Sequence, residues 1–426
     1  MGRHRGIVWL VEGAIPGDVV LAQALEVRPR LVEARAVEIL APAEGRREPA
    51  CPVQDRCGGC PWMILAEEEQ RAWKLRILAD ALRRIGRFAE CIPERIVASP
   101  LDLGYRNKVE LAFGRVAERP VLGFHGPATR AATDVERCLL QGSAGHRALE
   151  EARSFFLTGP GREDPALRDP ALRLVIRQSR IEDRVLVALR GADGPFETAR
   201  PFAQRVARAV PEVSGVVRLL GRPGRRGGTR TEILIGRPWL EDRLGGVVFR
   251  LPAATFFQVN PGAAEAVVAC VRDFACDSAG TQVADLYAGV GVYGIGLAAL
   301  GADVVACEAD RDAVACARRA ARDASVSSYR AVRSDVAAFL RSPEARSANP
   351  SVVVANPPRT GFGRGVAEGI AALRPTRIVI VSCDPATLAR DLRALADRGY
   401  APRRIVAFDL FPQTPHVESV TLLERS

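Results

Sequence analysis

The sequence predicts a chain of mixed α/β class that divides into three parts. Residues 1–45 are expected to form a small β-barrel of the oligonucleotide-binding kind, because short apolar runs alternate with turn residues there. From residue 282 onward, strand-like runs alternate with glycine-rich turns and helical stretches, which predicts a doubly wound parallel sheet over 256–426. Between the two, 46–255 are expected to form an α+β domain. With 426 residues, 48% of them hydrophobic, the chain has enough core for all three parts.

The formal net charge of +10 favours a nucleic-acid partner, although a general bias towards arginine would give the same sign. The sequence contains no apolar run long enough to span a bilayer, and its first residues lack the apolar stretch of a signal peptide. We therefore expect a cytoplasmic protein with no membrane association. Nothing in the sequence implies an obligate protein partner.

The expected barrel consists of apolar runs at 7–11, 17–22 and 31–39, with Pro16-Gly17 as the first turn. Because these runs begin abruptly, we expect the first strand to be short or absent.

Three cysteines in the next segment have the spacing of metal ligands. Cys51, Cys57 and Cys60 lie around a Gly-Gly pair that lets backbone amides approach bound sulfur. Cys138 is the candidate fourth ligand, and Cys91 is its competitor. Four thiolates suit either a [4Fe–4S] cluster or a structural zinc ion, and three clustered cysteines with a distant fourth favour the cluster.

The rest of the central part contains a predicted helix over 67–86 and a basic strand around Arg106 and Lys108. A basic strand face can bind a phosphate backbone, but an ordinary solvated face has the same pattern. The basic loop over 221–230 likewise fits either an RNA contact or an unengaged hairpin tip.

The first strand–turn–helix unit of the last part contains a nucleotide-binding pattern. Gly289, Gly291 and Gly294 match the G-x-G-x-x-G spacing, and Glu308 ends the following strand, where a ribose-binding acid is expected. That pattern fits NAD and S-adenosylmethionine alike. Asp285 precedes the turn and favours S-adenosylmethionine, because a carboxylate repels a pyrophosphate and attracts a cationic amino-acid tail. Asp335 suits an adenine contact or, equally, a helix N-cap.

Two further strands end in polar residues, at Asn356 and at Cys383. Asp384-Pro385 follows the cysteine and predicts the start of a helix. Since the carboxyl ends of parallel strands meet at one edge of a sheet, Cys383 is expected in the ligand crevice. A core-filling role is the alternative for this cysteine. Glu418 precedes the last apolar run and places a carboxylate near the same crevice.

A cysteine paired with a carboxylate suits attack on an electron-poor ring better than hydrolysis, which requires a histidine beside the nucleophile. The thiolate adds to C6 of a pyrimidine, C5 becomes nucleophilic, and the carboxylate later removes the C5 proton.

With these motifs the chain resembles the RNA uracil-5-methyltransferases, in particular the iron–sulfur branch that acts on 23S ribosomal RNA. The resemblance rests on the four cysteines, on Phe257-Gln258, and on the segments 285–289, 381–385 and 411–418. It implies an N-terminal TRAM-like barrel, a C-terminal S-adenosylmethionine-dependent methyltransferase domain, and 5-methyluridine in 23S rRNA as the product. It also implies the catalytic pair Cys383 and Glu418. The donor contacts that it implies are Gln258, Tyr287, Gly289, Val292, Glu308, Asp335 and Asn356. The implied cluster ligands are Cys51, Cys57, Cys60 and Cys138.

The chain departs from the family pattern at Asn356, where the family usually has an aspartate. Asparagine keeps the carbonyl and loses the charge, and Asn356-Pro-Pro then also resembles the signature of nucleic-acid amino methyltransferases. A transfer-RNA substrate, an amino methyltransferase, and a non-catalytic RNA-binding protein are therefore the alternatives. An NAD-linked oxidoreductase ranks below them.

Overall fold

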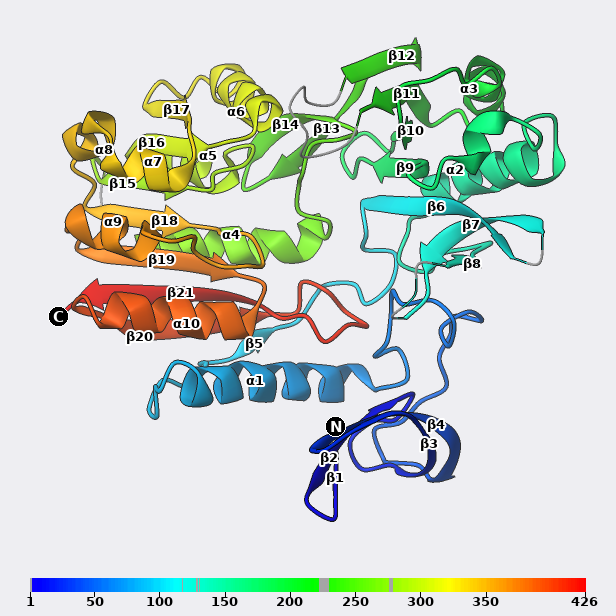
Figure 1. The fold of residues 1–426 in the computed structure, drawn as a ribbon. Helices are drawn as coiled ribbons and strands as arrows, with labels where there is room; N and C mark the ends of the chain where they lie inside the picture. Colours follow the sequence, from blue (N-terminus) through cyan, green and yellow to red (C-terminus); the bar gives the residue numbers. More distant parts are fainter. Residues whose placement is uncertain (1, 117, 128, 130, 222–229, 276–278) are drawn as a thin grey trace.

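A computed structural model describes residues 2–116, 118–127, 129, 131–221, 230–275 and 279–426. Figure 1 shows a C-terminal α/β body, a second sheet beside it, and a small N-terminal sheet next to helix α1 (Glu67–Arg84). Most of the basic loop expected at 221–230 lies outside the described residues. No helix in the described ranges is long and apolar enough to cross a membrane.

The N-terminal sheet has the strand order β1-β2-β4-β3. Its strands are β1 (Gly2–His4), β2 (Ile7–Glu12), β3 (Val19–Arg28) and β4 (Leu31–Ala41). Ile15 packs against Ile64 and Leu65, and Arg46 Nη2 donates to Asp18 at 2.7 Å. These contacts fix the small sheet to the segment that carries the first three cysteines of the predicted metal site.

The second sheet contains seven strands in the order β12-β11-β10-β9-β6-β7-β8. Helices α2 and α3 cover one face, where their apolar side chains pack with those of β6, β9 and β10. The strands are β6 (Lys108–Val116), β7 (Arg119–His125), β8 (Ala132–Asp134), β9 (Arg173–Gln178), β10 (Val185–Gly191), β11 (Val213–Leu220) and β12 (Arg230–Gly236), and the helices are α2 (Ser143–Arg153) and α3 (Ala199–Ala209). The hairpin β13 (Trp239–Leu244) and β14 (Val247–Pro252) follows, and β14 packs on α6 of the C-terminal body.

The C-terminal sheet has eight strands in the order β17-β16-β15-β18-β19-β21-β20-β5. Its strands are β15 (Gln282–Leu286), β16 (Asp303–Glu308), β17 (Tyr329–Arg333), β18 (Val352–Ala355), β19 (Arg377–Ser382), β20 (Tyr400–Phe408), β21 (Glu418–Arg425) and the short β5 (Ile96–Val97). The neighbouring strands from β17 to β19 pair in parallel, as the repeating pattern predicts, whereas β21 is antiparallel to both β19 and β20. The sheet is therefore mixed, because β20 and β21 are joined by a loop instead of a crossover helix.

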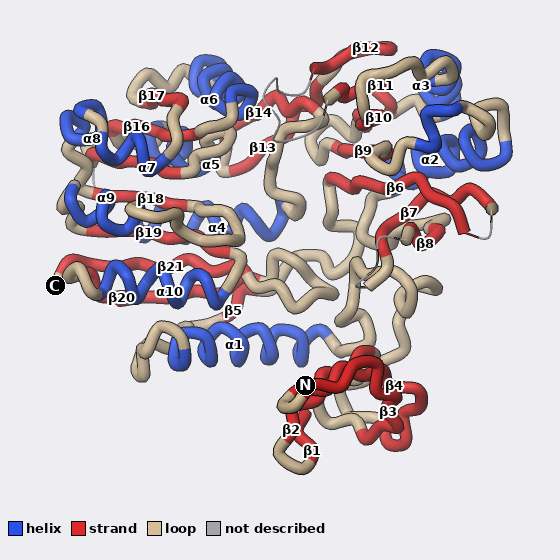
Figure 2. Tube along the Cα trace, viewed as in Figure 1, coloured by secondary structure: helices blue, strands red, loops and turns tan. Residues whose placement is uncertain are grey.

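Helices cover both faces of this sheet, as a doubly wound fold requires (Figure 2). One face is covered by α4 (Pro261–Ala275), α5 (Val292–Ala298) and α6 (Arg311–Asp323). The other is covered by α7 (Val336–Arg341), α8 (Pro343–Ala348), α9 (Val366–Ala372) and α10 (Pro385–Ala396). Helix α1 packs on α10, and its Leu78 and Leu82 are buried in the same cluster. Residues from 67 to 97 thus pack on the C-terminal body.

Candidate active site

Cys383 lies where the sequence predicts it, directly after β19 at the carboxyl edge of the sheet. Asp384 is the N-cap of α10 and accepts from the Thr387 backbone N–H at 2.8 Å, while Pro385 occupies the first turn. Asn356 follows the adjacent parallel strand β18 and therefore lies at the same edge. The predicted strand–turn–helix arrangement around the cysteine is confirmed.

Glu418 is brought to this edge by the antiparallel strand β21. Ser382 pairs with Ser419 across β19 and β21, so the residues next to them, Cys383 and Glu418, are neighbours in space. The Ser419 hydroxyl donates to the Ser382 carbonyl at 3.2 Å and fixes this register. A thiol and a carboxyl from distant parts of the sequence thus meet at one end of two paired strands.

The half-buried Cys383 thiol lies between opposing charges. Burial raises its pKa, and the nearby Glu418 carboxylate raises it further. The Arg359 guanidinium opposes both effects through its positive charge and a hydrogen bond to the sulfur. A reactive thiolate at this position therefore depends on Arg359.

The Glu418 side chain is almost fully buried, with 4% of its surface exposed. Burial raises its pKa to about 8, and the Arg359 charge limits this rise. A carboxyl group with a pKa near the working pH can both take up and give away a proton. The same guanidinium thus acts on the nucleophile and on the candidate base.

Sequence reasoning missed the role of Arg359. This residue follows Pro357-Pro358 and is not among the site residues that the sequence predicts. The available signal was a cation four residues beyond the end of β18, and a cation near a strand end is common on protein surfaces. Only the folded arrangement relates this cation to Cys383 and Glu418.

The glycine turn after β15 is an open cradle at the start of α5. Gly289 and Gly291 have positive φ angles of 56° and 86°, and nothing lies within 4 Å of the place where a Cβ of Gly289 would be. The Glu308 carboxylate accepts from the Gly289 backbone N–H at 2.9 Å. Glycine permits this backbone conformation at low cost, and a side chain at Gly289 would extend into the open space.

Asp285 lies beneath this cradle with no exposed surface. One carboxylate oxygen accepts from Gly294 N–H at 3.0 Å, and the other has no hydrogen-bond partner among the described residues. Burial raises the pKa of Asp285 to about 7, and the charge of Glu308 adds to the effect. The buried Tyr329 hydroxyl is likewise without a partner in the described part of the chain. A buried polar group without a hydrogen-bond partner destabilises the folded chain. Such groups are typical of a site where a bound ligand supplies the missing partner.

The other predicted donor residues lie around the same edge. Asp335 caps α7 by accepting from Ala338 N–H at 3.2 Å, so the N-cap interpretation is confirmed. Tyr287 follows β15 with φ at 57°, and its hydroxyl accepts from the Gly363 backbone. The Asn356 backbone N–H donates to the Leu286 carbonyl at 3.2 Å, which joins the ends of β18 and β15.

Tyr293 connects the donor side to the candidate base, and sequence reasoning did not select it. It follows Val292 in the first turn of α5, and its hydroxyl accepts from the Gln258 side chain. Burial raises its pKa far above the ordinary tyrosine value, and the charges of Glu418 and Asp285 contribute further. The pKa of Tyr293 thus responds to Asp285 on the donor side and to Glu418, the candidate base.

The four cysteines of the predicted metal site gather beside this region. Burial raises the pKa of Cys60 to about 12, and the charges of Cys138, Cys57 and Cys51 raise it further. Burial also raises the pKa of Cys57 and of Cys138, and the nearby backbone of Gly59 and of Leu140 partly offsets this rise. In the ranges that the structure describes, however, no set of three or more His, Cys, Asp or Glu side chains is arranged to hold a metal ion.

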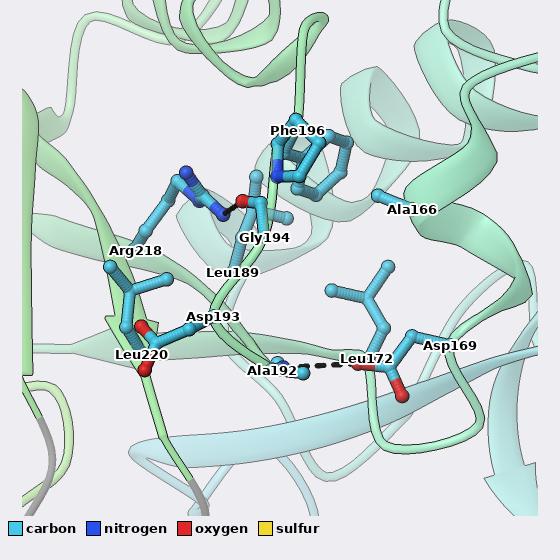
Figure 3. A pocket seen from close by; sticks show the side chains of 12 residues that line it. Ala166, Asp169, Leu172, Leu189, Ala192, Asp193, Gly194, Phe196, Arg218 and Leu220 are labelled. Carbon is cyan, nitrogen blue, oxygen red and sulfur yellow. Dashed lines mark hydrogen bonds between the residues drawn. The ribbon is translucent and has the colours of Figure 1, made fainter.

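A pocket in the second sheet is separate from these residues (Figure 3). It is lined by side chains such as Leu172, Leu189 and Phe196, and none of its lining residues comes from the C-terminal sheet. Its polar groups are already paired, since Arg218 donates to the Gly194 carbonyl at 2.6 Å and Asp169 accepts from Ala192 N–H at 3.0 Å. This pocket is therefore not part of the candidate active site.

A family model described as tRNA (Uracil-5-)-methyltransferase matches residues 224–426. A protein of Nitratidesulfovibrio vulgaris named "Uncharacterized RNA methyltransferase" is 35% identical, over 99% of this chain and 92% of its own length. The chain belongs to the RNA uracil-5-methyltransferase family. A similarly named relative from Gloeobacter violaceus is 33% identical over 99% of the chain and 92% of its own length.

A solved structure shows that the likeness covers the whole fold. It is the Pyrococcus abyssi tRNA (uracil-54, C5)-methyltransferase in complex with S-adenosyl-L-homocysteine, which superposes with a TM-score of 0.76 at 25% identity. The superposition covers 99% of this chain and 96% of that one. This RNA uracil-5-methyltransferase therefore has the Rossmann-like fold of S-adenosylmethionine-dependent methyltransferases, and the predicted α/β class is confirmed.

Proposed function

We propose that this chain transfers a methyl group from S-adenosylmethionine to C5 of a uridine in RNA through a covalent adduct. The single observation that carries the proposal is the adjacency of the Cys383 thiol and the buried Glu418 carboxyl. The positive charge of Arg359 lowers the pKa of both groups. Membership of the RNA uracil-5-methyltransferase family supports it.

In the proposed reaction the Cys383 thiolate forms a bond from its sulfur to C6 of a uracil that is turned out of its stack. The electrons of the C5–C6 double bond move towards C5 and O4. C5 would then take the methyl group from S-adenosylmethionine, whose bond from sulfur to the methyl carbon breaks to leave S-adenosylhomocysteine. Glu418 removes the remaining proton from C5. The double bond re-forms, and the C6–S bond breaks to release the thiolate.

S-adenosylmethionine supplies the electrophilic methyl group, and the residues around the glycine cradle fit such a ligand. The open space at Gly289 and the unpaired Asp285 oxygen offer room and negative charge for its cationic tail. Residues that would hold the donor are Gln258, Tyr287, Gly289, Val292, Glu308, Asp335 and Asn356. Since Asn356 is uncharged, its contact would be a neutral hydrogen bond.

We propose 23S ribosomal RNA as the substrate, because the motif set resembles the branch that modifies it. Transfer RNA is the second candidate, favoured by the names of the matching family model and of the Pyrococcus abyssi enzyme. The test offers both RNA pools separately with methyl-labelled S-adenosylmethionine and identifies the labelled nucleoside after digestion. We expect 5-methyluridine from one pool. Label on an exocyclic amino group would favour an amino methyltransferase, and donor binding without transfer would favour a binding protein.

Replacing Arg359 by Met is expected to move the pH–rate profile to higher pH and to lower kcat by about 10²-fold at neutral pH. The reason is that loss of the guanidinium raises the pKa of both Cys383 and Glu418, and both must be deprotonated to react. Rates measured from pH 6 to 10 check this, with Arg359→Lys as a partly restoring control. An unchanged profile would contradict the role of Arg359.

We propose that Cys51, Cys57, Cys60 and Cys138 hold a [4Fe–4S] cluster, with zinc as the alternative. Support comes from the spacing of the cysteines, three around a Gly-Gly pair and a fourth further along the chain, and from the mutual effect of these thiols on the pKa of Cys60. The cluster would order the segment that carries Cys51, Cys57 and Cys60.

Protein purified without oxygen is expected to be brown, with absorbance at about 400 nm and about four irons per chain. The Cys60→Ser variant should lose the absorbance. Cys91→Ser is the matched control and should keep it, because Cys91 packs against the apolar cluster of the C-terminal body. A colourless protein with one equivalent of zinc would establish the alternative metal.

A further inference from the structure

The loop over 409–417 joins β20 to β21 and ends directly before Glu418. Its surroundings come mainly from the first part of the chain. Buried Lys74 of α1 forms an ion pair with Asp409 and also donates to the Phe411 carbonyl at 3.0 Å. The Tyr105 hydroxyl donates to the Pro412 carbonyl at 3.1 Å. The residues that lead to the candidate base are therefore held by segments far away in sequence.

Gln413 is the centre of these contacts, with only 1% of its surface exposed. Its side-chain oxygen accepts from Gln70 at 2.9 Å and from Arg47 at 2.8 Å. Its backbone N–H donates to the Gln70 side chain at 2.8 Å, and its backbone carbonyl accepts from Trp62 N–H at 3.0 Å. The side-chain amide also donates to the Asp102 carbonyl at 3.4 Å. The polar groups of Gln413 are thus satisfied by the N-terminal half of the chain.

The backbone of Gln413 is in the left-handed region, with φ at 70°. For a residue with a side chain this conformation is unfavourable and persists only where its surroundings enforce it. Glycine would adopt this backbone conformation more readily, so the interactions of the glutamine side chain must offset its unfavourable free energy. The interactions with Gln70 and Arg47 supply this compensation.

The restraint extends from Gln413 along the chain to the base. The Thr414 hydroxyl donates to the Phe411 carbonyl at 2.8 Å and accepts from His416 N–H at 3.3 Å, which closes the turn. Val417, with 1% of its surface exposed, and then Glu418 follow directly. Gln413 is thus connected to the start of β21 at Glu418 through a closed turn and one buried residue.

We propose that Gln413 is a positioning residue that fixes Glu418 against the Cys383 adduct, and that Gln70 and Arg47 hold it in place. This inference rests on the proposed function, because it assigns Gln413 to the proton-removal step. Trp62 follows Cys60 by two residues, so the same contact joins the cysteine-bearing segment to the loop before the base. A well-ordered cysteine-bearing segment therefore also holds the loop before Glu418 in place.

The test compares full-length Gln413→Leu and Arg47→Met with the wild-type chain on RNA. Each variant is expected to lower kcat by about 10- to 100-fold with little change in the KM for RNA, as a misplaced group does. More informatively, the Cys383–RNA adduct should accumulate on denaturing gels, because its formation needs Cys383 whereas its resolution needs Glu418. The pH–rate midpoint should shift as well, since the surroundings of Glu418 change.

Arg47→Met provides a second variant if Gln413→Leu does not fold, since Arg47 is partly exposed and its loss opens no core cavity. Arg398→Met is the matched control; Arg398 pairs with Glu368 beyond the opposite end of α10, and the variant should behave as the wild type. Folded Gln413→Leu and Arg47→Met proteins with wild-type kcat and no adduct would overturn the inference. If the wild-type protein forms neither adduct nor 5-methyluridine, the proposed function itself fails.

Discussion

The Cys383→Ala variant is expected to lose at least about 10⁴-fold in the rate of uridine methylation. In the proposed reaction the sulfur activates C5 by adding to C6, and no other described residue is assigned to this step. Methyl transfer from labelled donor to RNA measures the loss. Binding of the donor, followed by calorimetry, should be unchanged, because Asp285 and the glycine cradle belong to β15 and the turn after it, and β18 separates β15 from β19, the strand before Cys383.

Cys270→Ala is the matched control for this variant, because Cys270 is a half-buried thiol of α4 that packs against the core. It should methylate RNA at the wild-type rate. Normal turnover by Cys383→Ala would exclude the adduct and would move the assignment to an amino methyltransferase that uses Asn356.

The Glu418→Gln variant is expected to form the methylated adduct but to release it about 10²- to 10⁴-fold more slowly, because the amide cannot take the C5 proton. A band of RNA-linked protein that resists denaturation should therefore accumulate, and it should disappear in the double variant with Cys383→Ala. A variant that turns over normally, or one that forms no adduct at all, would contradict the assignment of the base.

The Glu418→Gln variant is also expected to change the stability of the folded chain. Burial raises the pKa of Glu418 to about 8 in the folded chain, whereas an unfolded glutamate titrates at about 4.3. Because the folded form holds its proton more tightly, the group reduces stability progressively as pH rises between those two values. Glu418→Gln should therefore melt at an equal or higher temperature than the wild type at pH 8, which calorimetric unfolding would measure.

The sequence indicated the catalytic edge because its signals are local. A β-branched run followed by Cys383, Asp384 and Pro385 predicts a strand, a turn and a helix start, and these elements are present. The glycine spacing from Gly289 to Gly294 is local in the same way. Glu418 was expected near this edge because it directly precedes the last apolar run, but nothing in that run predicts an antiparallel strand beside β19.

Arg359, Tyr293 and Gln413 could not be predicted from the sequence, because their roles depend on partners far away along the chain. The amphipathic helix α1 shows what the sequence pattern leaves undetermined. Its apolar pattern predicts burial of Leu78 and Leu82, but it does not identify α10 as the partner. Lys74 is fully buried in this helix and paired with Asp409, whereas a lysine in a charged sequence is expected on the surface.

The most direct measurement is tritium release from RNA that is labelled at C5 of uracil, in the presence of S-adenosylmethionine. Proton removal by Glu418 after methylation predicts one tritium released for each methyl group incorporated, from either the 23S fragments or the tRNA pool. Methyl incorporation without tritium release would contradict C5 chemistry and, with it, the roles of Cys383 and Glu418.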